Sequence, residues 1–138
     1  PHTDILESEG VLVNDEMQGE WKFYYPNGSI KQYGSYQNDL AEGEFYYFNE
    51  AGKKTSQGSF KHGKWDGIWS WYNGSEQEYC RGYYADGLKA GDWVWFFADK
   101  SISRKAHYVN DVLDGKDVHY FNNGKISYTQ YWQNNVLD

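Results

Sequence analysis

The sequence predicts an all-β protein: an elongated antiparallel β-meander of repeated β-hairpins that form a twisted, curved and open sheet. Three observations lead to this prediction. Phe, Tyr and Trp make up 20% of the 138 residues, and such a composition, with 15 glycines, favours strands and tight turns over helices. One residue pattern recurs along the chain with a fixed period. Each copy of the pattern contains two turn signals between aromatic runs.

The repeat has a period of 24 residues, and no copy is shifted. A glycine opens every unit, so the chain divides into five units: 19–42, 43–66, 67–90, 91–114 and 115–138. Residues 10–18 match the end of a unit, as in residues 34–42. We therefore interpret residues 1–18 as an N-terminal cap or a partial repeat.

Each unit is predicted to be a β-hairpin. The sixth and eighteenth positions of every unit are aromatic, and a turn signal lies between them in the first, second and fifth units. Glycine supplies the positive φ that such a turn requires. A second turn signal follows the eighteenth position and leads into the next hairpin. The first-turn pairs are Asn27-Gly28, Ala51-Gly52 and Asn123-Gly124, and the second turns begin at Asn38, His62, Asp86, Asn110 and Asn134.

The third and fourth units depart from the first turn signal. The third has Asn73-Gly74 two residues early, and the fourth has Ala98-Asp99-Lys100-Ser101 without glycine. Because the unit length is unchanged, we expect these hairpins to persist with a different loop or a bulge.

The ends of the predicted sheet are open. A single hairpin is marginal in water, so each unit must pack against its neighbours. The outermost strands then expose unpaired edges that need a cap or a partner, and oligomerisation through a sheet edge is one solution. Asp138 is the last position of its unit, which leaves open whether the array extends further.

The repeat unit resembles the MORN repeat, in the 24-residue variant common in bacterial proteins. The closest match is GEWKFYYPNG, residues 19–28, and the resemblance covers residues 19–138. Ala106 and Asp117 depart from it, because the other units mostly have glycine and an aromatic residue there. The resemblance implies a single-layer or hooked sheet that serves as a scaffold or binding surface. It also implies protein partners or phospholipid headgroups as ligands, and no chemistry by the repeat itself.

Charge and cysteine content exclude several classes. The formal net charge is −7, and the 13 basic residues are scattered, which argues against nucleic-acid binding and against anionic membranes. Cys80 is the only cysteine, so no internal disulfide can form, and we expect a buried bystander. The chain contains no signal-peptide pattern and no long apolar run. The compartment stays unknown; the cytoplasm is favoured, with export after removal of a leader as the alternative.

The candidate ligand-binding or partner-binding residues are aromatic residues at the third and fifth positions of units two to four. Residues two apart point to the same side of a strand, so these side chains form one ladder along the sheet. The sixth position points to the other side. Structural packing is the favoured role of the ladder, and a ligand groove is the alternative. The six residues are Phe45, Tyr47, Trp69, Trp71, Trp93 and Trp95.

The sequence offers no catalytic, metal or cofactor site. The acidic residues before the unit glycines recur a whole repeat apart, which suits solvated turns better than a cation site. The four histidines have no metal-ligand spacing, although His107 and His119 could approach each other across strands. Neither a nucleophile elbow nor a phosphate loop is present. We expect no enzyme activity. The acidic residues are Glu42, Asp66, Asp114 and Asp138.

The leading functional hypothesis is a non-catalytic repeat scaffold that mediates protein–protein interaction. Its partner would be an unknown protein or peptide of basic or apolar character, bound on the aromatic-rich sheet face or at a free strand edge. Carbohydrate or choline-type cell-surface ligand binding is the alternative, because GEFYYFNEAGKK, residues 43–54, looks like choline-binding and glucan-binding repeats. Phospholipid or membrane association is a second alternative, suggested by the resemblance alone and opposed by the charge.

Overall fold

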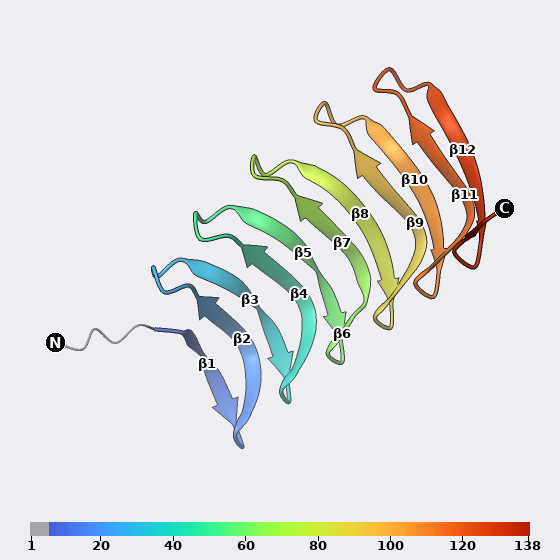
Figure 1. The fold of residues 1–138 in the computed structure, drawn as a ribbon. Coiled ribbons are helices and arrows are strands. Elements are labelled where there is room, and N and C mark those ends of the chain that lie inside the picture. Colours follow the sequence, from blue (N-terminus) through green and yellow to red (C-terminus); the bar gives the residue numbers. More distant parts are fainter. Residues whose placement is uncertain (1–5) are drawn as a thin grey trace.

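The computed structural model describes residues 6–138. These residues form one 13-stranded antiparallel sheet that follows the order of the chain. The hairpins stand in a single row with the two termini at opposite ends, and the sheet is not closed (Figure 1). The predicted all-β meander is confirmed. None of residues 6–138 is helical, so this part of the chain has no helix that could cross a membrane.

Most strands are six to nine residues long, and two are short. In chain order the strands are β1 (Ser8–Val13), β2 (Glu16–Tyr24), β3 (Ile30–Gln37), β4 (Leu40–Phe48), β5 (Lys54–Lys61), β6 (Lys64–Trp65), β7 (Gly67–Tyr72), β8 (Glu78–Ala85), β9 (Leu88–Phe96), β10 (Ile102–Val109), β11 (Val112–Tyr120), β12 (Ile126–Gln133) and β13 (Val136–Leu137). Of the cap predicted at residues 1–18, residues 1–5 lie outside the described residues.

β6 and β7 together correspond to one continuous strand of the other units. β6 pairs with β5 through Trp65 opposite Phe60, and β7 pairs with β5 through Trp71 opposite Ser56. Asp66 separates them. The equivalent segments β4, β9 and β11 are uninterrupted, so the break is local to the third hairpin.

The first turn of every hairpin has the same backbone geometry. The N–H of the tenth residue donates to the carbonyl of the seventh in all five turns, at 2.8 Å from Glu76 to Asn73 and 2.9 Å from Lys100 to Phe97. Glu76 (φ 59°) and Lys100 (φ 73°) adopt the left-handed conformation that glycine adopts in the other three turns. The expectation of a different loop or bulge in these two units is therefore wrong. The pairing of the strands is the same in every unit, so each turn must connect them with the same number of residues. The tenth residue therefore adopts the left-handed conformation whatever its type.

The second turns are two-residue turns of type I′, since both of their residues have positive φ, 49° at Asn38 and 67° at Asp39. Neighbouring turns are hydrogen-bonded to each other. The Oδ1 atom of Asp39 accepts from the N–H of Met17 at 2.6 Å. The Oε2 atom of Glu42 accepts from the N–H of His62 at 2.8 Å. The acidic residue that precedes the unit glycine thus holds the next turn in place.

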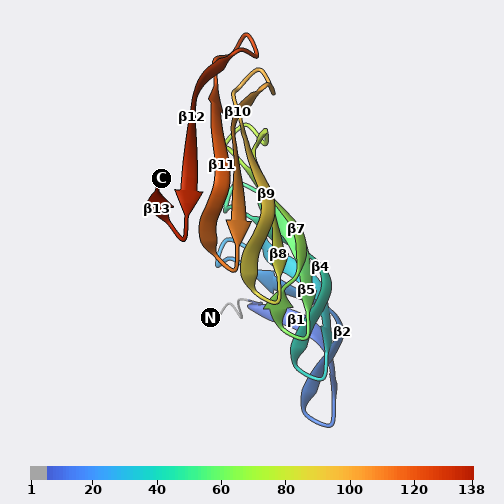
Figure 2. The same ribbon diagram turned by 90° about the vertical axis from the view of Figure 1, so that its right-hand side faces the viewer.

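Each strand that follows a second turn crosses a unit boundary and carries a bulge there. Gly43 lies inside β4 with φ 83°, and the pairing register of β3 with β4 shifts at Gly34 and Ser35. Such a bulge bends the strand, and all long strands are bowed in Figure 1. Seen from the side, the row is one layer deep and twists from β2 to β12 (Figure 2).

Candidate functional site

The third and fifth positions of each unit lie on one face of the sheet, which we call the core face. The third position is fully buried in the central units: Phe45 and Trp69 are 1% exposed and Trp93 is 3% exposed. These three side chains belong to the core of the protein, together with Cys80, Ala106 and Val118. They offer no free surface to a ligand, so the predicted contact role of Phe45, Trp69 and Trp93 is corrected to a packing role.

A glycine in the neighbouring strand makes room for each buried ring. A Cβ atom built on Gly58 would lie 2.0 Å from the ring of Trp69, and one on Gly82 would lie 2.0 Å from Trp93. Real Cβ atoms do not approach so closely, so each ring rests directly on backbone. The indole Nε1 of Trp69 then donates to the carbonyl of Ser59 at 3.1 Å. The glycine at the sixteenth position of a unit is therefore required by the ring of the next unit.

Aromatic side chains at the eighteenth position close over the buried rings. Phe60 packs edge-on against Phe45 at a centroid distance of 4.7 Å, and Tyr84 packs edge-on against Trp93 at 5.2 Å. In the third hairpin, Trp65 also stacks on Trp69 at 3.9 Å. These contacts explain how a single-layer sheet buries its rings almost completely.

The fifth position forms a second, half-buried row on the core face. It contains Phe23, Tyr47, Trp71 and Trp95, one from each of four successive hairpins. The residues opposite them in the return strands are small or polar, for example Ser56 opposite both Tyr47 and Trp71. Burial raises the pKa of Tyr47 to about 12, with a smaller contribution from Tyr36. We call these four rings the ring row.

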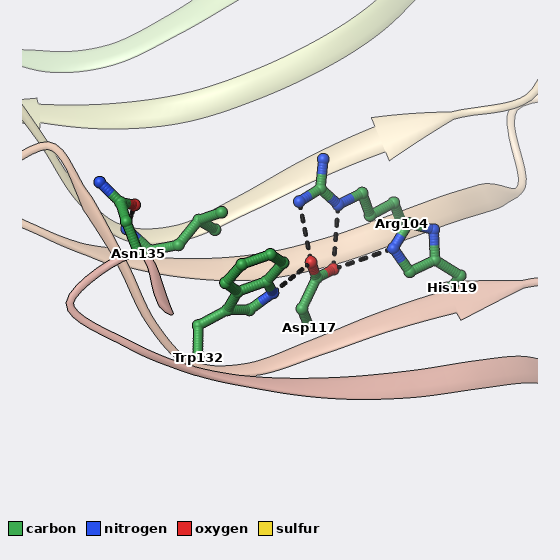
Figure 3. Close-up of polar contacts among 6 residues, drawn as sticks. Arg104, Asp117, His119, Trp132 and Asn135 are labelled. Carbon is green, nitrogen blue, oxygen red and sulfur yellow. Dashed lines mark hydrogen bonds and ion pairs between the residues drawn. The ribbon is translucent and has the colours of Figure 1, made fainter. Parts of the chain in front are cut away.

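The ring row ends at a polar cluster that the sequence did not predict. Asp117 takes the third position of the last unit and is 1% exposed. Arg104 on β10 donates to it from Nε at 2.9 Å and from Nη2 at 2.8 Å, and Trp132 on β12 donates from Nε1 at 3.0 Å (Figure 3). His119 lies beside the same carboxylate, with Nε2 3.3 Å from Oδ1. The signal in the sequence was the paired departure of Ala106 and Asp117, which face each other across β10 and β11.

The electrostatics of this cluster favour an ionised carboxylate. Burial raises the pKa of Asp117, but the hydrogen bonds from Arg104 and Trp132 and the charges of Arg104 and His119 more than offset burial. The pKa of Asp117 therefore lies below its usual value. The cluster is a buried ion pair with its acceptor oxygens satisfied.

A hollow of about 400 Å³ opens beside the cluster on the core face. Trp95 and Arg104 line one part of it, with the guanidinium carbon of Arg104 4.5 Å from the centroid of the Trp95 ring. His119 and Tyr128 line another part and are stacked at 4.2 Å. Ser103 and Ser127 also line the hollow.

The opposite face carries the sixth position, as predicted. Phe96 lines a hollow of about 420 Å³ there, together with the exposed side chains of Ile68, Tyr83 and Ile102. The guanidinium of Arg81 lies 5.4 Å from the centroid of the Phe96 ring and pairs with Glu78 at 2.7 Å.

Among residues 6–138, no three His, Cys, Asp or Glu side chains converge on a common point that could hold a metal ion. His107 lies opposite Asp92, whereas His119 stacks on Tyr128, so the two histidines do not form a pair. Cys80 is 6% exposed, and burial, the largest influence, raises its pKa to about 11, which suppresses the thiolate needed for reactivity.

Two stretches of the chain match a known repeat family. Residues 17–38 and 41–62 match the family model described as MORN repeat variant. No curated protein matched the sequence. A solved structure described as "Crystal structure of GtfA/B complex bound to UDP and GlcNAc" aligns with 95% of this chain and 25% of that chain, at 8% identity and a TM-score of 0.37. The chain thus spans about a quarter of that solved chain.

Proposed function

This chain carries MORN repeats of the variant type over residues 17–38 and 41–62, and from that premise we propose that it is a non-catalytic scaffold that binds an extended peptide segment of a partner protein. The observation that carries the proposal is the ring row. Its four rings are half-buried, uncharged and aligned across consecutive hairpins.

The spacing of the ring row suits an extended peptide that crosses the strands. Two strand spacings of about 4.8 Å separate neighbouring rings, which places them about 10 Å apart. A peptide in the extended polyproline II conformation has three residues per turn and advances about 3.1 Å per residue, so every third side chain would face the sheet and meet a ring. From Phe23 to Trp95 the row therefore accommodates about ten peptide residues.

Choline-type recognition is supported less well. A quaternary ammonium ligand needs an open aromatic face, and the chain's own cations already occupy several. Arg104 lies 4.5 Å from the centroid of the Trp95 ring, and Lys89 lies 4.8 Å from that of Trp93 and 5.0 Å from that of Tyr108. A choline titration at millimolar concentration should therefore leave tryptophan fluorescence unchanged, and a saturable change would favour the alternative.

The test combines peptide selection with position-specific crosslinking. A displayed library of random dodecapeptides is selected on the purified chain, and binders are then crosslinked to chains with a photoreactive phenylalanine at Ser56 or at Gln57. These neighbours point to opposite faces of β5, which makes Gln57 the matched control. We expect crosslinks from Ser56 only, and apolar residues at every third position of the peptides. Failure to select any binder, or equal crosslinking from both positions, would refute binding along the ring row.

If the crosslinks map to the terminal strands instead, the peptide binds at a sheet edge and not along the ring row. Trp71→Ala separates the two locations, because it removes a central ring of the row and leaves the edges intact. We expect this change to weaken the selected peptides at least tenfold.

A further inference from the structure

We propose that the hollow beside Arg104 is a carboxylate-binding subsite that receives an acidic side chain or the C-terminal carboxylate of the bound peptide. The inference rests on the proposed scaffold function and names one chemical feature of the partner. The subsite lies where the ring row meets the polar cluster of Figure 3.

The first argument is the unused part of the Arg104 guanidinium. Arginine has five N–H donors, and Arg104 uses one on Nε and one on Nη2 for Asp117. Figure 3 shows Nη1 pointing away from Asp117. No residue among 6–138 accepts a hydrogen bond from Nη1, so the Nη1 and Nη2 edge remains free for a second carboxylate. That edge binds a planar carboxylate through two parallel hydrogen bonds.

The second argument is that the free edge is held rigidly. Asp117 fixes the guanidinium from one side with two hydrogen bonds, and the Trp95 ring supports its flat face at 4.5 Å. The side chain of Arg104 is 27% exposed, so little of its surface faces water. A pre-organised, partly desolvated guanidinium loses less entropy on binding than a free surface arginine.

The third argument is the lining of the hollow. Ser103 and Ser127 are polar residues of its lining, and the stacked pair of His119 and Tyr128 supplies an aromatic wall. Neither Asp nor Glu lines the hollow in the part of the chain that the structure describes. The equivalent hollow at the first hairpin is lined by Glu7 and Lys31, so its cation is a lysine without the planar fork and a carboxylate stands in the same lining. Carboxylate recognition is therefore specific to the C-terminal end of the ring row.

The ligand for the test is the N-acetylated, C-amidated tetrapeptide Ala-Phe-Glu-Ala, titrated by calorimetry. Its counterpart with glutamine in place of glutamate removes the charge alone. A third peptide carries glutamine and a free C-terminus, which separates a side-chain carboxylate from a terminal one. We expect at least tenfold tighter binding of one or both carboxylate peptides than of the neutral peptide, and weaker binding as the salt concentration rises.

Three variants locate the binding. Arg104→Lys keeps the charge beside Asp117 but removes the planar fork, and Ser127→Trp places a bulky ring at an exposed position in the lining of the hollow. Both should abolish the preference for the carboxylate peptide. Arg81→Lys is the matched control, because Arg81 also lies over an aromatic ring and pairs with a carboxylate, on the opposite face. It should leave the preference unchanged, and circular dichroism checks the fold of each variant.

Each other outcome overturns the subsite. Equal affinity for the glutamate and glutamine peptides would show that the hollow does not bind a carboxylate. An unchanged preference in Arg104→Lys and Ser127→Trp would show that the carboxylate binds elsewhere. If the library peptides still crosslink from Ser56, the scaffold function stands and only the subsite fails. Equal losses in Arg81→Lys and Arg104→Lys would reduce the effect to general attraction of anions.

Discussion

The difference in burial between Trp69 and Trp71 yields a sharp prediction. Both side chains lie on the core face of β7, two residues apart, and both are tryptophan. Trp69 is 1% exposed and rests on Gly58, whereas Trp71 is half-buried in the ring row. Trp69→Ala should therefore destabilise the protein more than Trp71→Ala.

The expected magnitudes follow from the buried area. A fully buried aromatic side chain hides about 150–250 Å², which at about 25 cal/mol/Å² corresponds to roughly 4 kcal/mol for Trp69. Substitutions of this kind in protein cores cost about 3–5 kcal/mol. Ser59 loses the hydrogen bond from the indole but keeps the one from the N–H of Asp66 at 3.0 Å, so no buried acceptor is left without a partner. Trp71 buries less of its area than Trp69, which gives about 3 kcal/mol.

The assay is urea unfolding followed by far-ultraviolet circular dichroism, which does not depend on the tryptophan that is removed. Free energies are compared only where the denaturant slopes agree, because a repeat array can lose cooperativity. We expect Trp69→Ala to lose about 1 kcal/mol more than Trp71→Ala. Equal losses, or a larger loss at Trp71, would refute the assignment of the third position to the core and the fifth to an accessible row.

Four further predictions concern other parts of the fold. Gly82→Ala places a Cβ atom 2.0 Å from the ring of Trp93 and should cost about 1–3 kcal/mol in urea unfolding; combined with Trp93→Ala, its cost should fall below the sum of the two. Asp117→Asn leaves Arg104 without its counter-charge and should cost about 3 kcal/mol near pH 7. Because the pKa of Asp117 is depressed in the folded protein, the ion pair contributes fully above the unfolded pKa and is lost as pH falls through the folded pKa; the deficit of Asp117→Asn should therefore shrink on acidification below about pH 4, and a constant deficit would contradict the ion pair. With its pKa raised to about 11, Cys80 should react slowly with a thiol reagent near pH 8 in the native protein and readily after unfolding; rapid native labelling would indicate an open strand. Lys100→Gly relieves a left-handed backbone at φ 73° and should stabilise by about 1 kcal/mol, seen as a higher melting temperature.

The hairpins were predictable because their signals are local. The turn pair Asn38-Asp39 and the aromatic residues at fixed positions depend only on neighbours in the chain, and both occur where the sequence placed them. The same reasoning failed at Glu76 and Lys100, where residue type argued against a left-handed conformation. There the constant repeat length, rather than the identity of one residue, decided the turn.

The polar cluster was beyond reach of local reasoning. Asp117 could be recognised as a departure from the aromatic column, and Ala106 as a departure from the glycine column. The hydrogen-bond partners of Asp117 are distant in the sequence: Arg104 precedes Asp117 by 13 residues and Trp132 follows it by 15. Only the strand register places these two side chains on either side of one carboxylate, and the register shifts at bulges that the pattern does not reveal.

The sequence by itself determined the all-β meander, the 24-residue period and the face of the sheet on which each aromatic column lies, because strand alternation and turn chemistry act over a few residues. The tertiary structure alone decided how deeply each aromatic side chain is buried. Trp69 and Trp71 are equivalent in the alternation, yet one is buried and the other is half-buried. Burial depends on how the strands bend and on which rings of neighbouring hairpins close over them, and both are set by contacts between units rather than within one.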